Sequence, residues 1–214
     1  VYNTSSALEV YDSKILNNTA KAGSALYLST DSSAKAINTV FEGNACFESN
    51  TSNAAAVYMH PGGTATNYLF HSCTFKDNSS SGLGGAILSN GKGVIELYNT
   101  TATGNSAAKG GFMYETTAGT TVTISGLTVS GNTATVGGPI IWGNTVNAKL
   151  YINMVVSGTH VNGAYEAAAS TVYTYNAEMG TIVASINNGV YRFGTRNDKT
   201  YTTIGPVDVE KGNF

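Results

Sequence analysis

Short runs of this chain alternate apolar residues with polar or aromatic ones, as half-buried β-strands do. Clear examples run from Ile95 to Tyr98, from Val122 to Ser125 and from Leu150 to Asn153. The apolar residues do not follow the spacing of three and four that an amphipathic helix needs. The pattern therefore predicts an all-β protein.

A repeat of roughly 27 residues connects these runs. Each repeat contains two short motifs. The first consists of a hydrophobic residue, two spacers and Asn. The second, which follows it, consists of two small residues, a spacer and an aliphatic residue. The Asn positions are 26, 34, 27 and 27 residues apart, a period typical of solenoids. Three short strands and three turns fit one repeat, so we expect a parallel β-helix of about six to seven coils. The repeated Asn residues are Asn18, Asn44, Asn78, Asn105 and Asn132.

Stacked coils place equivalent residues about 4.8 Å apart in columns. We expect the Asn column to form a structural ladder at a buried turn, because carboxamides can bond both the turn backbone and their neighbours in the ladder. The small residue two places before each aliphatic residue is expected to allow a tight corner or a positive φ. The aliphatic column, expected to form the inner wall, is Leu26, Val57, Ile87, Met113 and Ile140.

A second column directly follows the aliphatic one and should point outward, because neighbouring residues of a strand face opposite ways. Its rings could stack and stabilise the outside of the sheet, or form an exposed binding surface along the solenoid. Trp142, one place further on, is expected to face inward. The outward stripe is predicted to contain Tyr27, Tyr58, Leu88, Tyr114, Ile141 and Tyr173.

The paired tetrapeptides Phe-x-x-Asn and Gly-Gly-Ala-Ile are clearest at residues 75–78 and 84–87. They resemble the repeats of the chlamydial polymorphic outer membrane proteins and related bacterial surface proteins. This resemblance covers about residues 8–174. It implies a right-handed parallel β-helix displayed outside the cell as an adhesin or passenger.

Composition narrows the choice of partners. Charged residues make up 11% of the 214 residues, and the net charge is −2. Such a chain lacks the basic patch that a nucleic acid attracts, and no run reaches the roughly 18 apolar residues of a membrane span. We expect a fragment of a longer exported protein that does not itself insert into a membrane, with β-helix repeats in residues 1–165 and irregular final coils or a capping segment in residues 166–214.

The acidic residues do not cluster by column, although glycoside hydrolysis needs two nearby carboxylates. Glu42 aligns with Lys76, and Glu9 aligns with Lys35, which predicts exposed pairs between neighbouring strands. No catalytic residue is assigned.

The sequence also suggests neither a metal site nor a cofactor. His60, His71 and His160 fall in unrelated phases of the repeat and have no partner at ligand spacing. Cys46 and Cys73 lie in different columns, which favours free thiols over a disulfide.

Taken together, these features favour a non-enzymatic extracellular surface module, an adhesin passenger or structural stalk that binds a protein or glycan on a cell surface. The alternative is a carbohydrate-active β-helix that binds or cleaves polysaccharide, which would need a lateral groove with acids from adjacent coils. Ice binding is weaker, because the Thr-rich segments 100–103 and 120–123 do not recur in phase.

Overall fold

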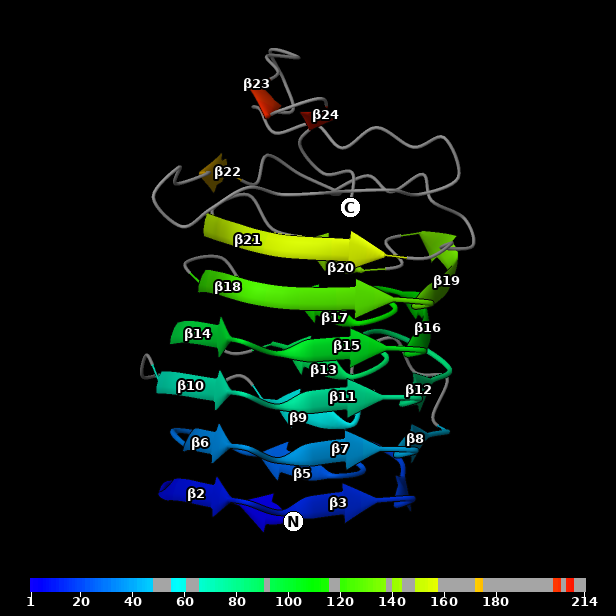
Figure 1. Ribbon diagram of the computed structural model, residues 1–214. Helices are drawn as coiled ribbons and strands as arrows, with labels where there is room; N and C mark the ends of the chain where they lie inside the picture. The colour runs from blue at the N-terminus through cyan, green and yellow to red at the C-terminus, as the bar shows by residue number, and fades with distance from the viewer. Residues whose placement is uncertain are drawn as a thin grey trace.

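The computed structural model describes residues 1–47, 55–60, 66–90, 93–115, 120–137, 140–143, 149–157, 172–174, 202–204 and 207–209, and describes side chains no further than Trp142. The regular structure of these residues consists of strands alone. They stack into a parallel β-helix, as the repeat predicts (Figure 1).

Three parallel sheets form the sides of the solenoid, each built from one strand or strand pair per coil. The first sheet contains β1 (Tyr2–Asn3), β5 (Leu26–Leu28), β9 (Val57–Met59), β13 (Ile87–Ser89), β17 (Met113–Glu115) and β20 (Ile141–Gly143). The third contains β4 (Thr19–Ala20), β8 (Ala45–Cys46), β12 (Ser79–Ser80), β16 (Ser106–Lys109) and β19 (Thr133–Gly137).

The second sheet is the largest, with 11 strands in two columns that join where a single long strand, β18 (Thr121–Ser130), spans both. One column contains β2 (Ala7–Tyr11), β6 (Ser33–Ile37), β10 (Thr66–His71) and β14 (Gly93–Tyr98). The other contains β3 (Lys14–Leu16), β7 (Val40–Glu42), β11 (Thr74–Lys76) and β15 (Thr101–Thr103). After β18 come β21 (Lys149–Ser157) and β22 (Val172–Thr174), while β23 (Thr202–Ile204) and β24 (Val207–Val209) form a separate antiparallel pair.

The coil is right-handed, since the strands of the second sheet run left to right in front, the strands of the first sheet run back behind them, and the chain rises (Figure 1). The third sheet has five stacked strands, so about four full turns are closed on all three sides within the described residues. This is fewer than the six to seven coils that the sequence predicts. Part of the expected remainder falls on residues outside the described ranges.

One extra residue shifts the register of the later coils. β16 and β19 pair as Ser106 with Thr133, but then as Lys109 with Gly137, so a β-bulge in β19 adds one residue. Met113 therefore lies opposite Ile141 rather than Ile140. The prediction that Ile140 continues the aliphatic column was wrong, although both isoleucines are buried in the core.

The interior of the coil is filled by stacked columns of apolar side chains. Phe41 stacks on Phe75 with ring centroids 4.8 Å apart, and Phe75 contacts Phe112 at 5.7 Å. All three rings are fully buried. Burial of such columns supplies the main stabilising term of the solenoid.

Glycine pairs shape the corner before the first sheet. Gly84 has a φ of +62°, whereas Gly85 has no positive φ and lies against the backbone of Ser106 and Gly111 in the next coil. In this pair the positive φ thus belongs to the first glycine, whereas Ala55, at the position of the second residue in the preceding coil, has a φ of +89° as the sequence suggested. The second glycine is needed because stacked coils approach too closely for a Cβ.

Candidate functional site

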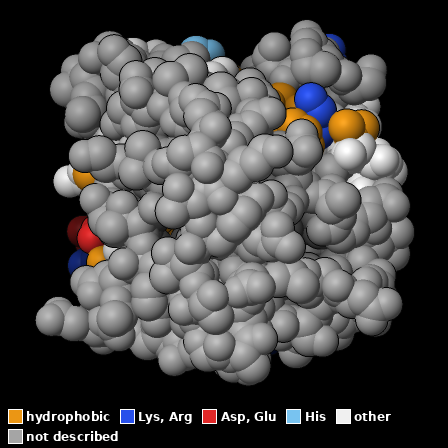
Figure 2. Space-filling model, turned by 90° about the horizontal axis from the view of Figure 1, so that it is seen from above, with side chains coloured by type: hydrophobic (Ala, Val, Ile, Leu, Met, Phe, Trp, Pro, Cys, Tyr) orange, Lys and Arg blue, Asp and Glu red, His pale blue; other side chains and the backbone are white. Residues whose placement is uncertain are grey.

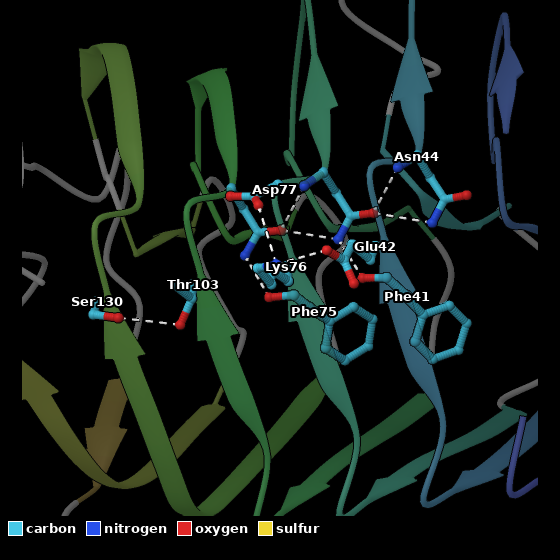
Figure 3. A network of polar contacts seen from close by, with 10 residues as sticks. Phe41, Glu42, Asn44, Phe75, Lys76, Asp77, Thr103 and Ser130 are labelled. Atoms are coloured by element: carbon cyan, nitrogen blue, oxygen red, sulfur yellow. Dashed lines mark hydrogen bonds and ion pairs between the residues drawn. The ribbon is translucent and has the colours of Figure 1, made fainter. Parts of the chain in front are cut away.

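The Asn column forms a hydrogen-bonded ladder at the turn between the second and third sheets, as predicted (Figure 3). The carboxamide Oδ1 of Asn105 accepts bonds from Asn78 N–H at 3.1 Å and from Asn78 Nδ2 at 3.0 Å. Its Nδ2 donates to Asn132 Oδ1 and to the Phe75 carbonyl, both at 2.9 Å. Four hydrogen bonds therefore hold this side chain, and Asn44 and Asn78 repeat the arrangement.

The ladder is buried except at its first member. Asn44, Asn78, Asn105 and Asn132 are all fully buried, while Asn18 is exposed at the N-terminal end. Asn18 Nδ2 still donates to Asn44 Oδ1 at 2.9 Å. Buried carboxamides with every bond made stabilise the turn and leave nothing for a ligand, so the ladder is structural.

The aromatic stripe points away from the coil interior, but its central members are buried. Tyr58, Leu88 and Tyr114 are 1%, 0% and 3% exposed and form a second hydrophobic cluster with Ala55 and Leu83. Leu83 comes from the corner that precedes the first sheet and packs in the same cluster as these outward side chains. The prediction of an exposed row was wrong, because alternation does not show what covers a face.

The membership of the stripe also differs from the prediction. Because of the bulge in β19, Tyr114 lies opposite Trp142, and their rings stack at 6.4 Å. Ile141 is buried in the interior, so the expected positions of Ile141 and Trp142 were exchanged. Tyr173 lies opposite Leu150 in the second sheet and is not part of the stripe; its side chain falls outside the described residues.

Sequence reasoning missed the first member of the stripe. Tyr2 lies opposite Tyr27 and stacks on it at 5.2 Å, and Tyr27 contacts Tyr58 at 5.0 Å. Tyr2 is 66% exposed, so the stripe emerges at the N-terminal end. The signal was available, because Tyr2 precedes Tyr27 by 25 residues, close to one repeat. At the other end Lys109 Nζ lies 4.7 Å from the Trp142 ring. In the view from above, hydrophobic side chains are seen beside charged ones at two opposite edges (Figure 2).

Alkaline pH is expected to weaken this second cluster. Burial, followed by the neighbouring charge of Glu115, raises the pKa of Tyr114 from 10.0 to about 12. A pKa that is higher in the folded state than in the unfolded state contributes stability that is complete below about pH 10 and is lost as the pH rises through about 12. Urea unfolding across this range should show a smaller loss of stability in Tyr114→Phe, which has no phenol to ionise. An identical pH dependence in the two proteins would contradict the assignment.

The outer face of the second sheet carries the charged side chains. Glu9 and Tyr11 of β2 recur as Glu96 and Tyr98 of β14, and in each pair the Tyr hydroxyl donates to the Glu carboxylate, at 2.5 Å and 2.9 Å. Lys35 lies opposite Glu9, and its Nζ is 5.4 Å from the centroid of the Tyr11 ring. The ion pairs of the described residues do not include the expected pair of Lys35 with Glu9. The hydrogen bond that the Lys35 ammonium donates to the Tyr11 oxygen raises the pKa of Lys35. The repeated Glu-x-Tyr is a signal that sequence reasoning did not use.

These side chains border a hollow of about 240 Å³ on the outer face. Its lining comes from four successive coils, through β2, β6, β10 and β14. The residues that line it are Ala7, Leu8, Glu9, Ser33, Ala34, Lys35, Asn67, Leu69 and Glu96.

The other column of the second sheet carries the expected pair of Glu42 and Lys76, whose charged atoms are 2.6 Å apart (Figure 3). Hydroxyl side chains lie beside it. Thr101 lies opposite Thr74 and Thr128, so threonines do stack here in phase. The sequence comparison set residues 100–103 against residues 120–123, which lie in different columns of the sheet. It therefore did not detect the stacking of these threonines.

The cysteines and histidines considered in the sequence analysis do not form a site in the described residues. Cys46 and Cys73 are free and buried, as expected. His60 contacts the rings of Tyr27 and Tyr58. Within the ranges that the structure describes, no three His, Cys, Asp or Glu side chains gather as a metal site.

The same ranges contain no helix that is long and apolar enough to cross a membrane. Comparison with known proteins gives no match, whether to a family model, a curated protein or a solved structure.

Proposed function

We propose that this chain is a non-enzymatic module displayed outside the cell, an adhesin passenger or structural stalk that binds a protein or glycan on a host or other cell surface. The parallel β-helix supports this proposal, since such a solenoid offers a long, regular side to a partner. The resemblance of its repeats to those of chlamydial polymorphic outer membrane proteins supports the same function.

The observation that carries the proposal is the placement of carboxylates on the outer face of the second sheet. Only Glu9 and Glu96 line the hollow among its described residues, and they lie on β2 and β14, three coils apart. Their backbones are thus about 14 Å apart, whereas glycosidases hold their two carboxyl groups about 5 to 9.5 Å apart. Glu115 is fully buried and out of reach of a substrate on this face. Within the hollow, this arrangement supports binding rather than cleavage.

Attachment to surfaces tests the proposed function. Beads coated with the purified chain should bind to host cells or to immobilised extracellular-matrix proteins and glycans, and soluble chain should compete. Beads coated with heat-unfolded chain are the matched control. If the folded and unfolded chains attach equally to every surface, the proposal is wrong.

Turnover assays test the non-enzymatic part of the proposal. We expect no reducing sugar and no unsaturated product from pectin, polygalacturonate, xylan or β-glucan, because the two carboxylates that line the hollow, Glu9 and Glu96, are too far apart for paired acid and base chemistry. Cleavage that is lost in Glu96→Gln but retained in Glu42→Gln would overturn the proposal and locate the active site in the hollow.

A further inference from the structure

The hollow on the second sheet combines an apolar floor with a polar rim. Leu69 and Ala7 contribute apolar surface, while Glu9, Asn67 and Glu96 provide hydrogen-bonding groups. Asn67 and Glu9 are exposed, and Leu69 and Glu96 are half-buried. A ligand in this hollow must therefore offer both an apolar face and many hydroxyl or amide groups.

Glu96 has unused hydrogen-bonding capacity. The ion pairs of the described residues join Lys76 to Glu42 and to Asp77, so Glu96 carries its charge without a cation. It accepts one hydrogen bond, from the Tyr98 hydroxyl at 2.9 Å. Partial burial, together with this bond, raises the pKa of Tyr98, so the phenol stays protonated and donates at neutral pH. A carboxylate can accept about four bonds, so Glu96 can receive further hydroxyl donors.

The charges of the hollow select against an acidic ligand. Two carboxylates, Glu9 and Glu96, face a single ammonium, and Lys35 already contacts Tyr11. An anionic sugar would meet net repulsion, whereas neutral hydroxyls donate to carboxylates at no such cost.

The size and position of the hollow favour a thin chain over a folded protein. A stable protein partner covers about 800 Å² on each side, usually around aromatic anchors, and a hollow of about 240 Å³ holds only a small part of one. Interior strands such as β6 and β10 are paired on both sides, so a peptide could not add to the sheet there. The lining residues succeed one another from coil to coil along the solenoid axis.

We infer that the hollow between β2 and β14 binds a neutral oligosaccharide that runs along the solenoid axis, with Glu96 and Asn67 receiving and donating hydrogen bonds and Leu69 contacting a sugar face. This inference rests on the proposed function as a binding module and names its ligand class. Because the hollow is shallow, the dissociation constant should be on the order of 0.1 to 1 mM.

Calorimetric titration with linear hexasaccharides tests the inference. The probes are the neutral hexamers of glucose, mannose, xylose and N-acetylglucosamine, with hexagalacturonate as the acidic contrast. At least one neutral hexamer should bind saturably, and hexagalacturonate should bind at least tenfold more weakly. Glu96→Ala should weaken neutral binding about tenfold or more, because a hydrogen bond to a charged group is lost. Asn67→Ala changes an exposed residue, keeps the fold, and should weaken binding severalfold.

Glu42→Ala is the matched control, since Glu42 is an outward glutamate of the same sheet outside the hollow. Its sugar binding should equal that of the unchanged chain. The inference is overturned if no neutral hexamer binds at a concentration about 10-fold above the expected dissociation constant, or if hexagalacturonate binds best. It is also overturned if Glu96→Ala and Asn67→Ala bind the neutral hexamers as tightly as Glu42→Ala does. Attachment to surfaces without any sugar binding would overturn this inference while leaving the proposed function in place.

Discussion

Replacing Asn105 with Leu is expected to lower the free energy of unfolding by at least ~3 kcal/mol, because the change removes four buried hydrogen bonds. Asn78 loses the acceptor of both its backbone N–H and its Nδ2, and the Phe75 carbonyl loses its donor. Unpaired buried groups of this kind cost about 1 to 3 kcal/mol each. Urea unfolding followed by circular dichroism measures the difference.

Asn18→Leu is the control for this prediction. Asn18 belongs to the same ladder, but it is exposed, and its side chain donates to Asn44 Oδ1 and to the Leu16 carbonyl. Water can replace these bonds, so the cost should stay below about 1 kcal/mol. If both variants lose the same stability, the cost does not come from buried bonds in the ladder.

Replacing Gly85 with Ala should destabilise the solenoid by about 3 kcal/mol or more, or prevent its folding. A Cβ at this position would lie 2.6 Å from the Ser106 carbonyl oxygen and 2.8 Å from the Ser106 nitrogen, and would also meet the Gly111 carbonyl oxygen. All of these are backbone atoms of the next coil, which cannot move without breaking the stacking. Thermal unfolding and the yield of folded protein measure the effect.

Gly131→Ala separates steric crowding from backbone strain. Gly131 has a φ of +63°, and the nearest atom to an added Cβ is the Gly104 nitrogen, at 3.9 Å. The left-handed conformation costs an alanine about 1 to 2 kcal/mol. Alanine also lowers the conformational entropy of the unfolded chain relative to glycine, which offsets part of that cost. A loss of about 1 kcal/mol is therefore expected. A loss as large as that of Gly85→Ala would show that φ, rather than the approach of coils, governs these corners.

The two faces of the first sheet show where sequence reasoning reaches its limit. The alternation along β9 and β13 correctly predicted that Val57 and Ile87 face the interior of the coil and that Tyr58 and Leu88 face away from it. It could not show that Leu83 packs in the same cluster as these outward side chains. That contact depends on the path of a corner, which no periodic pattern describes.

The lateral hollow was not visible in the sequence for a related reason. Its lining brings together Glu9 and Glu96, which are 87 positions apart, and only the stacking of four coils places them on one face. The repeat could have located their shared columns. Whether side chains there leave space depends on the sizes and rotamers of all their neighbours.

By itself the sequence determined the parallel β-helix, its period and the Asn ladder, because in a solenoid each coil repeats the same local contacts and equivalent positions must meet. The tertiary structure alone decided the register after the bulge in β19, which exchanged Ile141 and Trp142. It also decided which outward faces are covered and where a hollow remains. Stacking follows from the period of the chain, whereas corners, bulges and coverage follow from packing between residues that the period does not relate.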